Sequence, residues 1–162
     1  MKIDKFVFDL DRTIWDTYDI TGRPIWAKQM LPPYEKAGDK IMDDVGSYCV
    51  LRTGFRDYIQ DLSDRGVKIG FISVGAIKDY EDEFQPSIQM LKIFGIYDLF
   101  NSEKVLAYKK ESKLQHLRNC KVCYYFDDDE KYLSDAREVK DVSEFDSKEI
   151  TDWKLFNERE RL

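Results

Sequence analysis

The sequence lacks the features that would place it in a membrane, on nucleic acid or outside the cell. No apolar run approaches the roughly 20 residues that a membrane helix requires. The first residues, MKIDKFVFDLDRT, carry acids where a signal peptide has its apolar segment. With a net charge of −6, the chain lacks the basic excess that binds a phosphate backbone. We therefore expect a cytoplasmic protein with neither a membrane nor a nucleic-acid partner.

Cysteine and histidine are also scarce, with three cysteines and one histidine. An odd number of cysteines suits a reducing compartment better than a disulfide framework. Cys120 and Cys123 have CxxC spacing, but they begin a strand-like run, in which residues three apart face opposite sides. We expect thiols that fill the core, with a redox or zinc role as the alternative.

What the sequence does contain is enough apolar material for one domain. Its 162 residues are 43% hydrophobic, which is sufficient for a core, and we expect a single domain over 1–162. Apolar runs at 6–10, 67–74 and 122–127 are each followed by a polar turn and a helical pattern. This alternation predicts an α/β fold of three layers, a Rossmann-like parallel sheet flanked by helices.

The weaker patterns complete the expected order of elements. Pro86 breaks or restarts one of the expected helices, and Ser112 caps another. The less regular stretch 16–52 is predicted to be a flap or a β-hairpin. We expect short strands at 104–108 and 139–145, and helices over 54–66, 76–96, 112–119 and 130–138 and from about Ser147 onward.

Polar side chains follow each of the three strong strands. Asp9 and Asp11 follow the first strand, Ser73 ends the second, and Asp127 and Asp128 follow the third. Ligands of open parallel sheets bind at the carboxyl ends of the strands, so these residues are expected to converge. The acids would repel one another unless a cation or protons compensated them, and Mg²⁺ prefers such oxygen ligands.

The spacing of the first two acids indicates a division of labour. Residues two apart on an extended chain face the same side, so Asp9 and Asp11 can work on one substrate as nucleophile or metal ligand and as proton donor. A phosphoryl group attacked there needs hydrogen-bond donors and positive charge. Ser73 can supply the first and Lys113 the second.

Three motifs resemble those of the haloacid dehalogenase (HAD) superfamily: FDLDRT, FISVG and YYFDDDE. Within it, FDLDRTIW followed by YFDDDE is most similar to the magnesium-dependent phosphatases. The resemblance implies an HAD-like fold and a phosphoric monoester hydrolase. Asp9 would be the nucleophile that forms an aspartyl-phosphate, and Asp11 would protonate the leaving oxygen and later activate water.

The resemblance also implies the remaining ligands. Mg²⁺ would be held by Asp9, the main-chain carbonyl of Asp11, and Asp128, with Asp127 as the secondary candidate. Phosphoryl oxygens would be bound by Thr13, Ser73 and Lys113, with Lys109 and Lys110 as alternatives for the lysine. Arg12 stands where the nearest relatives carry an aromatic residue, and we expect it to alter substrate preference.

The spacing of the motifs leaves no room for a full cap domain. An open site would accept a phosphorylated small molecule or a phosphoprotein, including phosphotyrosine. Aromatic residues of the 16–52 segment either line the entrance or pack onto the core: Tyr18, Trp26, Tyr34 and Tyr48. Two alternatives remain, a phosphotransferase or mutase of the same fold and a non-catalytic receiver-type phosphoacceptor domain.

Overall fold

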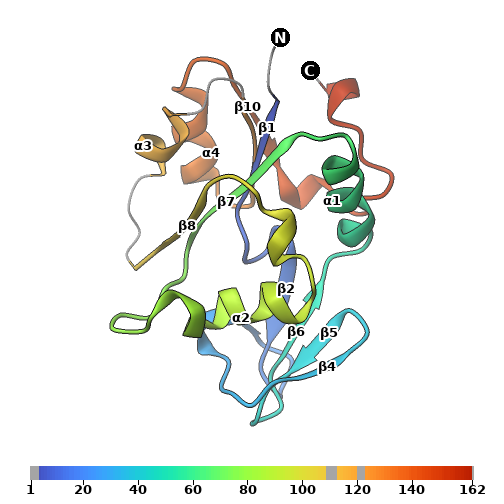
Figure 1. Ribbon diagram of the computed structural model, residues 1–162, viewed down its shortest axis with the longest axis vertical. Helices are drawn as coiled ribbons and strands as arrows, with labels where there is room; N and C mark the ends of the chain where they lie inside the picture. The colour runs from blue at the N-terminus through green and yellow to red at the C-terminus, as the bar shows by residue number, and fades with distance from the viewer. Residues whose placement is uncertain (1–3, 109–112, 120–122, 162) are drawn as a thin grey trace.

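The centre of the molecule is a five-stranded parallel sheet of order β10-β9-β1-β7-β8 (Figure 1). The structure, a computed structural model, describes residues 4–108, 113–119 and 123–161. The α/β arrangement is consistent with a Rossmann-like fold, and this part of the expectation is confirmed. The strands are β1 (Lys5–Phe8), β7 (Lys68–Val74), β8 (Lys104–Ala107), β9 (Cys123–Asp127) and β10 (Val142–Asp146).

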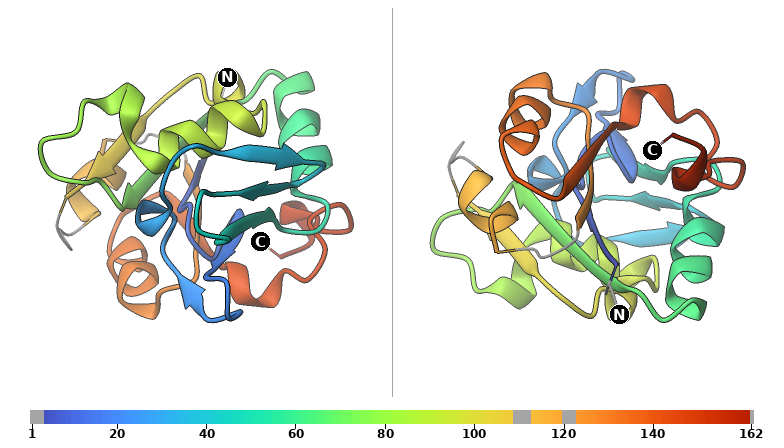
Figure 2. Two further views of the ribbon diagram at one scale, coloured as in Figure 1. Left: turned by 90° about the horizontal axis from the view of Figure 1, so that it is seen from below. Right: turned by 90° about the horizontal axis from the view of Figure 1, so that it is seen from above.

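Helices cover both faces of this sheet, as Figure 2 shows. Alternate strand residues face opposite sides, so Phe6 and Phe8 of β1 join one apolar cluster and Val7 joins another. Both faces are buried, which explains why the parallel strands are continuous apolar runs. One cluster includes α1 residues and the other includes α3 and α4 residues. The α-helices are α1 (Phe55–Asp64), α2 (Pro86–Ile93), α3 (Leu114–Leu117) and α4 (Glu130–Arg137).

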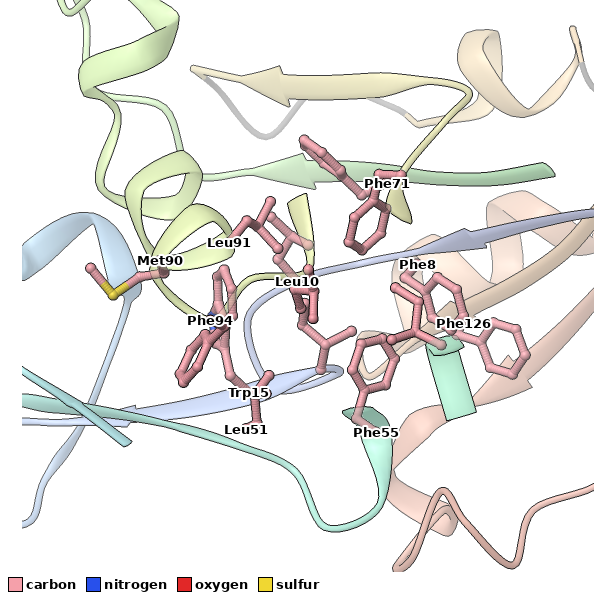
Figure 3. Close-up of a cluster of buried hydrophobic side chains, with 14 of the residues drawn as sticks. Phe8, Leu10, Trp15, Leu51, Phe55, Phe71, Met90, Leu91, Phe94 and Phe126 are labelled. Atoms are coloured by element: carbon pink, nitrogen blue, oxygen red, sulfur yellow. The ribbon is translucent and has the colours of Figure 1, made fainter. Parts of the chain in front are cut away.

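A second sheet, antiparallel and of order β3-β2-β6-β5-β4, is inserted between β1 and α1. It lies at the end of the molecule opposite the N-terminus (Figure 1), and its strands and the turns between them form the stretch 16–52, which is thus larger than the expected hairpin. Leu10, Trp15 and Phe94 join its interior to that of the parallel sheet (Figure 3). Its strands are β2 (Trp15–Tyr18), β3 (Pro24–Ile25), β4 (Glu35–Ala37), β5 (Lys40–Met42) and β6 (Tyr48–Leu51).

Helix α1 shows how the local sequence sets an element. Its buried residues recur at helical spacing, and it starts directly after Gly54, which has φ of 77°. A side chain at Gly54 would also collide with Asp152 and Lys154, so this start requires glycine. The buried residues of α1 are Phe55, Tyr58, Ile59 and Leu62.

Two expected helices are wrong in extent. Residues 76–85 do not continue a helix, because Pro86 occupies the first turn of α2 and begins it afresh. The stretch after Ser147 contains only short 3₁₀ turns, because the N–H of Trp153 donates to the carbonyl of Thr53 instead of within a helix. The 3₁₀ helices are η1 (Ala27–Gln29), η2 (Asp82–Phe84), η3 (Tyr97–Leu99), η4 (Ser147–Glu149) and η5 (Glu158–Arg161).

Several other sequence expectations have clear outcomes. Cys49 and Cys123 are buried within the two apolar clusters, as expected of core thiols, whereas Cys120 lies outside the described residues. The expected cap Ser112 also lies outside them. None of the helices in the described ranges has the length and apolar character needed to cross a membrane.

Candidate active site

The carboxyl ends of three neighbouring strands form the candidate site. β1 lies between β7 and β9, so the loop after β1 is flanked by Ser73 on one side and Asp127 on the other. The main-chain N–H of Asp9 donates to the carbonyl of Phe126 at 2.8 Å, which holds the start of this loop against β9. The strand order therefore brings together residues that are more than 60 positions apart in sequence.

Asp9 is nearly buried and has two polar neighbours. Its Oδ1 accepts from Lys113 Nζ at 3.1 Å, and its Oδ2 lies 3.5 Å from the hydroxyl of Thr13. Burial raises the pKa of Asp9 well above its usual value; Lys113 opposes this effect, whereas Asp127 and Asp128 add to it. Asp9 therefore needs further positive charge nearby to be fully ionised.

Asp127 is completely buried and positions Lys113. Its Oδ2 accepts from Lys113 Nζ at 2.7 Å and from the hydroxyl of Tyr125, and its Oδ1 accepts from the N–H of Asp129 at 3.0 Å. Burial lowers the pKa of Lys113, but the charges of Asp9 and Asp127 together raise it by more than burial lowers it. The net shift of the Lys113 pKa is therefore upward. Lys113 is thus held as a cation between two carboxylates.

Asp128 completes a cluster with metal-ligand geometry. Asp9, Asp127 and Asp128 place one carboxylate oxygen each within 4.8 Å of one another. Burial, and then the charge of Asp127, raises the pKa of Asp128 to about 6. Lys113 compensates only part of the negative charge, and all the donors are hard oxygens. The residues present therefore fit a divalent cation. We call these four residues, Lys113 included, the acidic floor.

Asp11 connects the loop to the inserted sheet. Its Oδ1 accepts from Trp15 Nε1 at 3.0 Å and from the N–H of Ala27 at 3.1 Å. Its Oδ2 is buried and has no hydrogen-bond partner in the described ranges. Burial raises the pKa of Asp11, and the two N–H donors partly offset this. Because Oδ1 already accepts two hydrogen bonds, a proton on Asp11 would reside on Oδ2.

A cavity of about 490 Å³ opens above the acidic floor, within the size range of small-molecule sites. It is also lined by Arg12, Trp26 and Lys28, which we call the cationic wall. The guanidinium carbon of Arg12 lies 4.1 Å from the centre of the Trp26 ring. The carboxylates of the floor thus come from the ends of parallel strands and Lys113 from just before α3, whereas Trp26 and Lys28 come from the insertion.

The structure brings most of the predicted site residues together. Thr13 does not line this cavity; its side chain is fully buried and lies 3.1 Å from the hydroxyl of Ser147. Lys109 and Lys110, the alternatives to Lys113, lie outside the described residues. The predicted residues that line the cavity are Asp9, Asp11, Ser73, Lys113, Asp127 and Asp128.

Sequence reasoning missed three supporting residues. Tyr125 lies two positions before Asp127 on the same strand face, and this spacing was the signal that its hydroxyl could reach the carboxylate. Ser147 follows the end of β10 and bonds to the carbonyl of Arg12 at 3.3 Å, another polar residue at a strand end. Lys28 carried no sequence signal, because tertiary folding of the insertion brings it to the cavity.

Together these features define an α/β protein with a five-stranded parallel sheet and a carboxylate cluster at its strand ends. No protein-family model matches the chain, and no curated protein matches it. What the site can do chemically follows from its residues: they can hold a cation, present a carboxylate beside a lysine, and offer a second carboxyl group as a proton donor.

Proposed function

We propose that the chain is a magnesium-dependent phosphatase of the HAD type, with an HAD-like fold that lacks a full cap domain. It would hydrolyse phosphate monoesters through an aspartyl-phosphate. One observation carries the proposal: Asp9 is paired with Lys113, clusters with Asp127 and Asp128, and lies in the same cavity as Asp11. A nucleophile, a cation site and a proton donor are thus present together.

In the first step, an ionised oxygen of Asp9 attacks phosphorus as the bond to the ester oxygen breaks. Asp11 Oδ2 gives its proton to the departing oxygen, so an alcohol leaves instead of an alkoxide. Lys113 and Ser73, both lining the cavity, stabilise the negative charge on the phosphoryl oxygens. The burial that raises the pKa of Asp11 favours the protonated form that this step needs.

In the second step, water attacks the phosphorus of the aspartyl-phosphate. Asp11, now ionised, takes a proton from that water, and the bond from phosphorus to Asp9 breaks. Inorganic phosphate and the free carboxylate of Asp9 result, and Asp11 is again protonated. The hydroxyl of Thr13, buried below Asp9, helps to keep the nucleophile in place.

Asp9 and Asp128, with the main-chain carbonyl of Asp11, are the proposed ligands of Mg²⁺. Both side-chain oxygens of Asp127 already have partners, which favours Asp128 as the second carboxylate ligand. Bound magnesium would neutralise the excess carboxylate charge and polarise the phosphoryl group. Asp127 then acts mainly by positioning Lys113.

The test is hydrolysis of 4-nitrophenyl phosphate with and without Mg²⁺. We expect magnesium-dependent turnover by the native protein and a loss of roughly 10⁴-fold or more in Asp9→Asn, because the nucleophile is removed. The matched control is Asp98→Asn, an exposed carboxylate in η3, which should retain full activity. Undiminished turnover by Asp9→Asn would contradict the proposal.

The same preparation separates the two alternatives. A receiver-type domain would take up one phosphoryl group per chain from a small phosphodonor and hold it, without multiple turnover. A phosphotransferase would move the phosphoryl group to an added sugar in preference to water. Labelled phosphate counted in protein, sugar and solution distinguishes these outcomes.

A further inference from the structure

Arg12 is held in an unusual backbone conformation beside the proposed proton donor. Its φ of 62° is left-handed, a conformation that is strained for a residue other than glycine. The conformation is fixed on both sides: the N–H of Arg12 donates to the carbonyl of Trp15 at 2.8 Å, and its carbonyl accepts from Ser147. This backbone conformation fixes where the Arg12 side chain leaves the loop beside the cavity.

The Trp26 ring covers one face of the guanidinium group, whereas no residue that the structure describes forms an ion pair with its N–H edge. The guanidinium carbon of Arg12 lies 4.1 Å from the ring centre of Trp26, so the aromatic ring supports the charged plane. Within the described ranges no carboxylate forms an ion pair with Arg12 or Lys28. Lys113, the third cation that lines the cavity, already has two carboxylate partners.

The position of Trp26 and Lys28 is also fixed. They flank Ala27, whose N–H is bonded to Asp11, so the start of η1 is anchored to the loop that carries Arg12. Both Arg12 and Lys28 lie close enough to Asp11 for their charges to oppose the rise in its pKa that burial causes. Two cations that have no ion-pair partner among the described residues therefore line the same cavity as the floor, where a phosphoryl group would bind.

We propose that Arg12 and Lys28 form a second anion site, and that the substrate is a phosphate monoester carrying a further carboxylate or phosphate group. This inference rests on the proposed phosphatase function and adds its substrate class. The planar N–H edge of Arg12 suits the two oxygens of either anion, and the cavity of about 490 Å³ leaves room beyond one phosphoryl group. Cations that line the cavity also attract an anionic substrate to a protein of net charge −6.

The test compares substrates that differ only in the second group. Glycerol 3-phosphate and 3-phosphoglycerate test the effect of an added carboxylate. Fructose 6-phosphate and fructose 1,6-bisphosphate test the effect of an added phosphate. We expect the native protein to prefer the member that carries the second anionic group in at least one pair, measured as the ratio of kcat/KM. That ratio should fall about 10- to 100-fold in Arg12→Gln, which loses a charged hydrogen bond, and less in Lys28→Gln.

Two controls keep the result specific. Lys68→Gln removes an exposed lysine at the amino end of β7, away from the cavity, and should leave the ratio unchanged. Arg12→Lys keeps the charge but not the planar edge, and should restore only part of the preference. The inference is overturned if native protein treats both members of each pair alike, or if the ratio is the same in Arg12→Gln and Lys28→Gln as in native protein.

Calorimetry with Asp9→Asn protein separates this inference from the proposed function. If no ester is hydrolysed, the phosphatase proposal fails, and binding still tests the anion site. 3-Phosphoglycerate should then bind more tightly than glycerol 3-phosphate, or fructose 1,6-bisphosphate more tightly than fructose 6-phosphate. This difference in affinity should disappear when Arg12→Gln is added to Asp9→Asn. Equal binding of both members of both pairs would overturn the second site by itself.

Discussion

The acidic floor and the cationic wall line one cavity but differ in burial and in pairing. The floor is buried and internally paired: Lys113 is 2% exposed and contacts both Asp9 and Asp127. The wall is partly open to solvent: Trp26 is 41% exposed, and its cations form no ion pair with the described residues. Buried pairs fix geometry, whereas cations without such partners are available to a ligand.

The origin of the two sides in the chain differs as well. The carboxylates of the floor lie at the ends of β1 and β9, so their geometry depends on the sheet register. On the wall, Trp26 and Lys28 belong to the insertion between β1 and α1, whereas Arg12 belongs to the loop after β1, which also carries the proposed nucleophile. The residues proposed to choose the substrate thus come partly from the insertion and partly from the catalytic loop. Asp11 belongs to both sides, because it lies beside Asp9 and bonds to Ala27.

After the loss expected for Asp9→Asn, the largest effect is expected from Asp11→Asn, which keeps an oxygen for Trp15 and Ala27 but removes the proton. Hydrolysis of an alkyl phosphate should fall about 10²- to 10⁴-fold, the usual range for general acid–base catalysis. The loss should be much smaller with 4-nitrophenyl phosphate, whose leaving group needs little protonation. Steady-state kinetics on both substrates provide the measurement, and equal losses would mean that Asp11 serves only to hold the wall.

Lys113→Met tests how much the ion pairs of the floor contribute to the stability of the protein. Two buried carboxylates lose their cation, so the free energy of unfolding should fall by about 3–5 kcal/mol, measured by urea denaturation at pH 7.5 without metal. The matched change on the wall, Lys28→Met, should stay within about 0.5 kcal/mol of the native value. Similar losses for both variants would remove the contrast between floor and wall.

The pH dependence of the free energy of unfolding should report the raised pKa values of the floor carboxylates without any assay of activity. Asp128, with a pKa of about 6, and Asp9, with a raised pKa, bind a proton more tightly when folded than when unfolded. The metal-free protein should therefore gain stability from these groups as the pH falls from about 7.5 to 5. Asp128→Asn should gain less over that interval.

Magnesium provides the control for that measurement. It competes with protons for the same carboxylates, so it should raise Tm more at pH 7.5 than at pH 5. Thermal denaturation with Mg²⁺ or with a chelator at both pH values gives the comparison. A Tm that does not respond to Mg²⁺ at either pH would argue against a cation on the floor.

The smallest effect is expected from Trp26→Ala on the wall. Losing the ring under Arg12 removes about 0.5–1 kcal/mol of cation–π stabilisation, so the preference for a substrate with a second anionic group should fall about two- to fivefold. Tyr18→Ala is the matched control, since Tyr18 packs against Tyr48 and does not line the cavity. An unchanged ratio in Trp26→Ala would show that Arg12 needs no support from the ring.

The parts of the fold that the sequence predicted are those set by local pattern. Buried parallel strands leave continuous apolar runs, and the residues at their ends meet because the sheet order requires it, so the cluster around Asp9 and Asp128 was accessible to sequence reasoning. The start of α2 at Pro86 followed from the missing N–H of proline.

The remaining parts depend on contacts between distant segments. The apolar residues Ile150, Trp153 and Phe156 recur every third position and imitate a helix, but main-chain pairing of Trp153 with Thr53 overrides that pattern. Lys28 reaches the cavity because Asp11 bonds to the preceding residue, and no local signal marks such a contact. The wall was therefore not predictable in detail, although Arg12 was marked as a departure from the nearest motif.

The pairing of β2 with β6 has a consequence for engineering. Trp15 lies opposite Leu51 and Tyr18 opposite Tyr48, so the chain leaves and rejoins the core at adjacent points. The loops and strands between Tyr18 and Tyr48 can therefore be exchanged as a cassette, with both ends of the graft already held by an antiparallel ladder. Libraries confined to this cassette that retain η1, whose Ala27 N–H binds Asp11, would vary what the cavity admits while leaving the carboxylates at the ends of β1 and β9 in place.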